Sequence, residues 1–116
     1  MLSWLKITVG LILKKTDAVM YTIDEIKKIV SPIAKVHGVQ SVSLFGSYAR
    51  KQAHDKSDID LLIDKGNIQT LYQLSSFRLD IEDALKLPVD LVTSDSNDHD
   101  FLTGIRKDEV LIYGEP

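Results

Sequence analysis

The order of apolar patterns along the chain constrains the fold more than any other feature of the sequence. Three segments, residues 23–36, 68–85 and 101–105, space their apolar residues as amphipathic helices do. Short β-prone runs alternate with them, at residues 42–45, 59–63, 88–92 and 110–113. Residues 48–53 could add a short helix. This alternation predicts an α/β (α+β) domain, with a small mixed sheet flanked by helices.

The first helix has the clearest limits in the sequence. Thr22 and Glu25 form the Thr-x-x-Glu pattern of a capping box, and Gly38 is a suitable C-terminal stop. Pro32 lies inside the pattern and could kink or break the helix near Val30.

Length and composition limit the chain to one ordinary globular domain. It has 116 residues, of which 44% are hydrophobic and 27% charged, so one core needs no covalent staples. The absence of cysteine excludes disulfides, thiolate zinc sites and a cysteine nucleophile, and it is compatible with a cytoplasmic location. A net charge of -3 argues against direct nucleic-acid binding, which needs a basic face.

The first nineteen residues differ from the rest. Residues 2–13 are largely apolar, but the run is too short to span a membrane and Lys6 interrupts it. The lysine pair at 14–15 follows the run, which is the reverse of a secretory signal. We therefore expect residues 1–19 to be a loosely packed extension to a domain at 20–116, the alternative being an added strand or helix, and we expect no membrane association. Met20 precedes a clear helix start, which gives the hypothesis that translation begins there.

A Gly-Ser pair ends the first β-prone run. Gly46 permits a tight turn and a close approach of the backbone to a ligand. Ser47 then stands near a helix N-terminus, where N–H groups and a hydroxyl can hold phosphate. The alternative is a plain strand-to-helix turn in which Ser47 is the N-cap.

Three acidic residues accompany the other strands. Asp58 and Asp60 are two residues apart, so in a strand both carboxylates lie on one face and require a cation or solvent between them. Asp90 stands among apolar residues of the third run, and a buried carboxylate there needs a partner or a metal. If these strands are neighbours, the three carboxylates meet at one edge. The alternatives are a solvated Asp60, an Asp58 in the preceding turn and a surface Asp90.

The motifs together resemble a known family. Residues 46–50 read GSYAR and residues 57–64 read SDIDLLID, which resembles the nucleotidyltransferases related to DNA polymerase beta. The chain is most similar to the minimal nucleotidyltransferases (MNT), the antitoxin halves of HEPN–MNT toxin–antitoxin pairs. The resemblance implies that Gly46 and Ser47 contact nucleotide phosphate. Arg50 matches a frequent arginine of the motif and could contact phosphate; the alternative is a surface salt bridge to an acid such as Asp55. Lys51 stands where the family often has glycine.

The resemblance also implies an activity and partners. It implies transfer of AMP from ATP to a tyrosine of a HEPN ribonuclease toxin encoded nearby, in a hetero-oligomer. Two Mg²⁺ ions would be held by Asp58, Asp60 and Asp90, and Asp90 could also act as the base. Two alternatives stay open: an antitoxin that neutralises its toxin by binding alone, and an adenylyltransferase for a small molecule such as an aminoglycoside.

Overall fold

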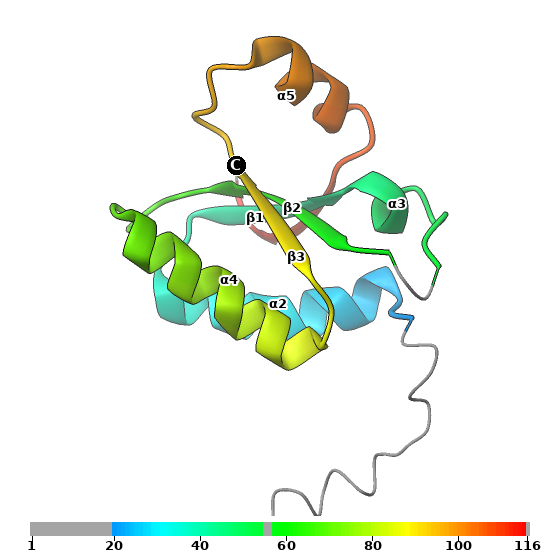
Figure 1. Cartoon of the computed structure of the whole chain (residues 1–116), viewed down its shortest axis with the longest axis horizontal. Helices are drawn as coiled ribbons and strands as arrows, with labels where there is room; N and C mark the ends of the chain where they lie inside the picture. Colours follow the sequence, from blue (N-terminus) through cyan, green and yellow to red (C-terminus); the bar gives the residue numbers. More distant parts are fainter. Residues whose placement is uncertain (1–19, 55–56, 116) are drawn as a thin grey trace, which may run out of the picture.

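A computed structural model describes residues 20–54 and 57–115 (Figure 1). The expected extension at residues 1–19 lies outside the described residues. The elements, in chain order, are α2 (Ile23–His37), β1 (Ser41–Phe45), α3 (Gly46–Ala49), β2 (Ile59–Asp64), α4 (Leu71–Leu85), β3 (Val89–Thr93), α5 (His99–Arg106) and β4 (Val110–Gly114).

The strands form one mixed sheet in the order β3-β2-β1-β4. β1 is antiparallel to both β2 and β4, whereas β2 and β3 are parallel and are joined through α4. The second and third predicted strands, β2 and β3, are therefore neighbours, and β3 and β4 are the edge strands of this sheet. The predicted small mixed sheet flanked by helices is confirmed.

The two faces of the sheet are covered unequally. Helices α2 and α4 lie side by side against one face, and α5 lies over the other (Figure 1). The main core fills the first interface and draws on α2, α4 and every strand. The second face carries a much smaller buried cluster of Leu62, Leu102 and Ile105. The open part of that second face is therefore available for a site.

Helix α2 begins as the sequence predicts. The Thr22 hydroxyl accepts from the Glu25 N–H, and the Glu25 carboxylate accepts from the Thr22 N–H at 2.8 Å. Gly38 ends the helix in the left-handed conformation. The helix is not broken near Val30, because it continues through Pro32 to His37.

Helix α4 begins later than predicted. Ile68 is buried in the loop before the helix, and the capping box formed by Thr70 and Gln73 places the first helical residue at Leu71. The pattern Thr-x-x-Gln was visible in the sequence and could have located this start. As a result, Leu71 is exposed instead of facing the core.

None of the helices in the described part of the chain is both long and apolar enough to cross a membrane.

Candidate active site

Gly46 lies where β1 turns into α3. Its φ of 76° is a left-handed conformation, and a Cβ at this position would collide with the Asp60 carboxylate. Phe45 is the N-cap of α3, and among the described residues no side chain caps this helix. Ser47 is in the first turn, so the alternative in which it is the N-cap is wrong. The backbone N–H groups of this turn therefore lie next to Asp60 without a side-chain cap.

The strand register places the central residues in one row. Phe45 of β1 is opposite Asp60 of β2, and Asp60 is opposite Asp90 of β3. Asp60 alternates with core residues of β2, so it lies on the face of the sheet that α5 covers in part. Asp58 immediately precedes β2 and is exposed. The structure therefore brings Asp60 and Asp90 side by side and places Asp58 next to them, as expected when the two strands are neighbours.

The sequence left two positions open for Asp90, buried within a strand or at the surface. The structure confirms the second, because Asp90 is exposed. The reason is the position of β3 at the edge of the sheet, where one side of the strand has no neighbouring strand among the described residues. The Asp90 carboxylate is therefore accessible from solvent.

Electrostatics link the three carboxylates. The pKa of Asp60 is raised from 3.8 to about 6, first by burial and then by the negative charges of Asp90 and Asp58. The Arg50 guanidinium acts in the opposite direction. The neighbouring acids are therefore close enough to Asp60 to disfavour its charged form.

The carboxylates of Asp58, Asp60 and Asp90 suit a hard divalent cation, although they do not converge on one point. Within residues 20–54 and 57–115, no three His, Asp or Glu side chains converge as ready metal ligands. Carboxylate oxygens are nevertheless the ligands that Mg²⁺ uses in nucleotide-dependent enzymes. Burial and, after it, the negative charges of Asp90 and Asp58 raise the pKa of Asp60, and a bound cation would offset both. The residues therefore fit a magnesium site that is completed by the nucleotide's own oxygens.

Arg50 and Lys51 end the α3 segment. Arg50 Nη1 is 3.6 Å from Asp108 Oδ2, so the expected competing ion pair exists, with Asp108 as the acid. Asp55, named by the sequence as a possible partner, lies outside the described residues. Lys51 has a φ of 61°. The backbone therefore adopts the left-handed conformation that glycine favours, although the residue is lysine.

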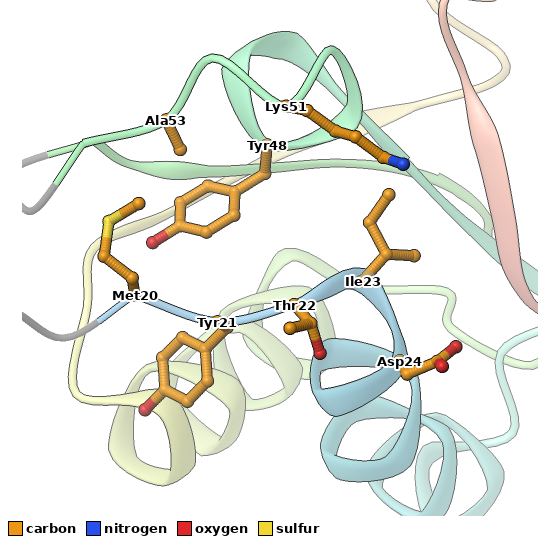
Figure 2. A pocket seen from close by; sticks show the side chains of 8 residues that line it. All are labelled: Met20, Tyr21, Thr22, Ile23, Asp24, Tyr48, Lys51 and Ala53. Carbon is orange, nitrogen blue, oxygen red and sulfur yellow. The ribbon is translucent and has the colours of Figure 1, made fainter.

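Two hollows flank α3. One, of about 450 Å³, lies between α3 and α5 and is lined by Phe45, Gly46, Arg50 and Phe101, among others. The other, also about 450 Å³, lies beside the start of α2; Tyr48 and Lys51 are among the residues that line it (Figure 2). Asp58, Asp60 and Asp90 are not among the lining residues of either hollow. The first hollow is the nearer one to the acidic row, because Gly46, which lies against the Asp60 carboxylate, is part of its wall.

Other acidic residues have structural roles. Asp98 caps α5 by accepting from the Phe101 N–H at 3.0 Å. Asp95 accepts from Thr93 and pairs with Lys65 at 2.9 Å, and these contacts lower its pKa. Helix capping and surface contacts therefore account for Asp98 and Asp95.

Comparison with known proteins places this geometry in a family. Residues 27–116 match the family model described as "Polymerase beta, Nucleotidyltransferase". Protein adenylyltransferase MntA of Thermococcus cleftensis is 36% identical over 81 residues, covering 66% of this chain and 82% of the relative. MJ0435 of Methanocaldococcus jannaschii, provisionally named a protein adenylyltransferase, is 40% identical over 74 residues, covering 64% and 80%.

Solved structures share the fold. A structure described provisionally as a minimal nucleotidyltransferase superposes with a TM-score of 0.67 at 25% identity, covering 78% of this chain and 95% of that one. A toxin–antitoxin crystal structure with AMP-PNP gives 0.68 at 21% identity, covering 77% and 73%. A tri-AMPylated Shewanella oneidensis HEPN toxin in complex with MNT antitoxin gives 0.64 at 18%, covering 81% and 74%. The chain belongs to the polymerase beta family of nucleotidyltransferases and is a nucleotidyltransferase.

Proposed function

We propose that this protein transfers AMP from ATP to a tyrosine of a partner HEPN ribonuclease toxin. The observation that carries the proposal is the row of Asp60 and Asp90 beside the Gly46 turn, with Asp58 next to it. Two further points support it. The relatives with 36–40% identity are named protein adenylyltransferases, and one structural neighbour is an AMPylated HEPN toxin with its MNT antitoxin.

In this proposal the acidic residues hold two Mg²⁺ ions. Asp58 and Asp60 would bind both ions, and Asp90 would bind the ion on the acceptor side. When bound, the ions neutralise the negative charge that develops on the phosphate oxygens during transfer. The raised pKa of Asp60 supports this assignment, because a cation would offset the burial of this carboxylate as well as the negative charges of Asp90 and Asp58.

The remaining residues orient the reactants. Gly46 and Ser47 would direct N–H groups and a hydroxyl at the β- and γ-phosphates, and Arg50 would leave Asp108 to contact phosphate. The 450 Å³ hollow beside Gly46 is within the size range of small-molecule sites, roughly 300–1,000 Å³, and would receive the nucleoside.

The transfer of AMP needs only ATP and the acceptor hydroxyl as reactants. The acceptor hydroxyl oxygen forms a bond to the α-phosphorus of ATP while the bond to pyrophosphate breaks. The hydroxyl proton passes to Asp90, whose exposed carboxylate stands at the acceptor side of the row. Pyrophosphate would leave on the side of Gly46 and Ser47, away from the acceptor hydroxyl.

A labelling experiment tests this proposal. The protein is incubated with α-labelled ATP, Mg²⁺ and the protein encoded by the neighbouring gene, and the mixture is resolved by mass. We expect label on a tyrosine of the neighbour protein, and no label with Asp58→Asn/Asp60→Asn.

Other outcomes would redirect the assignment. Toxin neutralisation that persists in the double variant, without any label, would favour an antitoxin that acts by binding alone. Label on an added aminoglycoside, with none on the neighbour protein, would favour a small-molecule adenylyltransferase.

A further inference from the structure

The Arg50 side chain is held by residues from two separate parts of the chain. Its Nε donates to Gln52 Oε1 at 3.2 Å, and its Nη1 lies 3.6 Å from Asp108 Oδ2. Gln52 belongs to the same turn as Arg50, because the Gln52 N–H donates to the Ser47 carbonyl at 2.8 Å. Asp108 comes instead from the connection between α5 and β4. The guanidinium is therefore tethered within its own turn and paired with an acid from the C-terminal part of the chain.

The fold keeps Asp108 at the same end of the sheet as the Gly46 turn. Val110 of β4 is opposite Leu44 of β1, so the residues just before β4 lie beside the end of β1, where the turn begins. The Asp108 N–H donates to the Ile105 carbonyl at 3.2 Å, and Ile105 is buried in the smaller cluster under α5. The backbone of Asp108 is therefore anchored, which holds its carboxylate within reach of Arg50.

The contact between Arg50 and Asp108 is weak enough to be exchanged for another anion. A separation of 3.6 Å is longer than a hydrogen bond, so the attraction is between the charges alone. Both side chains are also exposed, by 44% and 43%, and exposed ion pairs contribute little. A phosphate group offers arginine more charge and a bidentate set of acceptor oxygens. A polyphosphate can therefore take the guanidinium from the Asp108 carboxylate.

The position of this ion pair relates it to one part of the nucleotide. Gly46, Arg50 and Asp108 all line the hollow between α3 and α5. In the proposed function, the β- and γ-phosphates of ATP lie at the Gly46 turn and leave from there as pyrophosphate. Phosphate oxygens and the Asp108 carboxylate would therefore compete for the same guanidinium. AMP has only an α-phosphate, so it would not enter this competition.

We propose that Asp108 is a specificity-determining residue that competes with the β- and γ-phosphates for Arg50, and so limits how tightly the site holds polyphosphates. ATP binding displaces the guanidinium from Asp108, and its return to Asp108 after transfer favours the release of pyrophosphate. This inference rests on the proposed function, because it concerns the triphosphate side of the same site, but it does not involve the acceptor protein.

Equilibrium binding to the full chain tests the proposal with three probes in the presence of Mg²⁺: pyrophosphate, α,β-methylene-ATP and AMP. Asp108→Asn removes the charge of the side chain and keeps its size. We expect this variant to lower the dissociation constants of pyrophosphate and α,β-methylene-ATP about two- to fivefold, as the loss of an exposed ion pair allows. The dissociation constant of AMP should not change.

Two controls separate competition for Arg50 from general charge repulsion. Asp100→Asn removes an equal charge from the same hollow, and Asp100 is not an ion-pair partner of Arg50 within residues 20–54 and 57–115. It should change the pyrophosphate affinity less than Asp108→Asn does. In an Arg50→Gln background, Asp108→Asn should have no further effect, because a residue that acts through Arg50 is not additive with its loss.

The proposal is overturned if Asp108→Asn weakens pyrophosphate binding or leaves it unchanged. It is also overturned if AMP gains as much affinity as pyrophosphate, or if the gain persists in the Arg50→Gln background, since general repulsion would then explain it. A gain in pyrophosphate affinity by a protein that labels no tyrosine would contradict the proposed function and leave the role of Asp108 supported. The two inferences can therefore fail independently, because binding is measured without an acceptor.

Discussion

The two faces of the sheet differ in what their side chains do. The face under α2 and α4 is closed by fully buried apolar residues, which include Ile59, Leu61 and Ile63 of β2. The opposite face holds Asp60 and Asp90 and is covered only in part by α5. The first face supplies stability through burial, whereas the second keeps mutually repelling carboxylates together. Stability and chemistry are therefore separated across the thickness of one sheet.

The largest expected effect is on catalysis at the open face. Asp60→Asn should lower AMP transfer by about three orders of magnitude or more, since it removes a proposed ligand of both cations. Asp64→Asn, on the same strand and the same face, should transfer at the wild-type rate. Initial rates with labelled ATP measure both. Equal losses in the two variants would contradict a specific role for Asp60.

A matched pair of leucines compares the faces by stability. Leu85→Ala in the main core should lower the free energy of unfolding by about 3–5 kcal/mol. Leu102→Ala in the smaller cluster should cost about 2 kcal/mol or less, because solvent already reaches that site and the structure can adjust. Urea denaturation measures both values. A larger loss of unfolding free energy for Leu102→Ala than for Leu85→Ala would contradict the view that the face under α2 and α4 supplies most of the stability.

Gly46→Ala should lower both the stability of the fold and the rate of AMP transfer. The left-handed backbone alone should cost about 1–2 kcal/mol, because an L side chain is strained there. The added methyl group would also displace the Asp60 carboxylate, so we expect transfer to fall by about a hundredfold. Thermal unfolding and labelled-ATP assays provide the two readouts. Full activity in this variant would contradict the close approach of Gly46 to Asp60.

The raised pKa of Asp60 predicts a pH dependence of stability without metal. Its pKa of about 6 lies above the ordinary 3.8, so the folded state disfavours the charged form. The contribution of Asp60 to stability therefore decreases as pH rises from about 4 to about 6, and stays at its lowest value above that window. In EDTA, Asp60→Asn should gain stability relative to wild type between about pH 4 and about pH 7. Urea denaturation of both proteins at the two pH values measures this gain. The same difference in unfolding free energy between variant and wild type at both pH values would contradict the prediction.

The smallest effect is expected at Lys51. Lys51→Gly relieves a left-handed φ of 61° but adds backbone entropy to the unfolded chain, so stability should rise by no more than about 1 kcal/mol. Gln52→Gly, at the next position, is the control and should lower stability. A marked loss with Lys51→Gly would indicate that the lysine side chain itself supports the turn.

Much of this arrangement could be predicted from local sequence patterns. Helical spacing and the Thr22–Glu25 capping box located α2, and the motif from Gly46 to Asp60 located the candidate site. Strand pairing and exposure depend on contacts between distant residues, so the edge position of Asp90 required the structure. The same limit applies to Leu71, since periodicity alone does not reveal that the helix begins there and leaves the side chain in solvent.

The most direct test of the central claim is anomalous diffraction from crystals grown with Mn²⁺ and a non-hydrolysable ATP analogue. We expect metal peaks within coordination distance of the Asp58 and Asp60 carboxylates, with Asp90 on the acceptor side and the triphosphate at Gly46 and Ser47. Metal bound elsewhere, or a triphosphate seated away from the Gly46 turn, would contradict the claim.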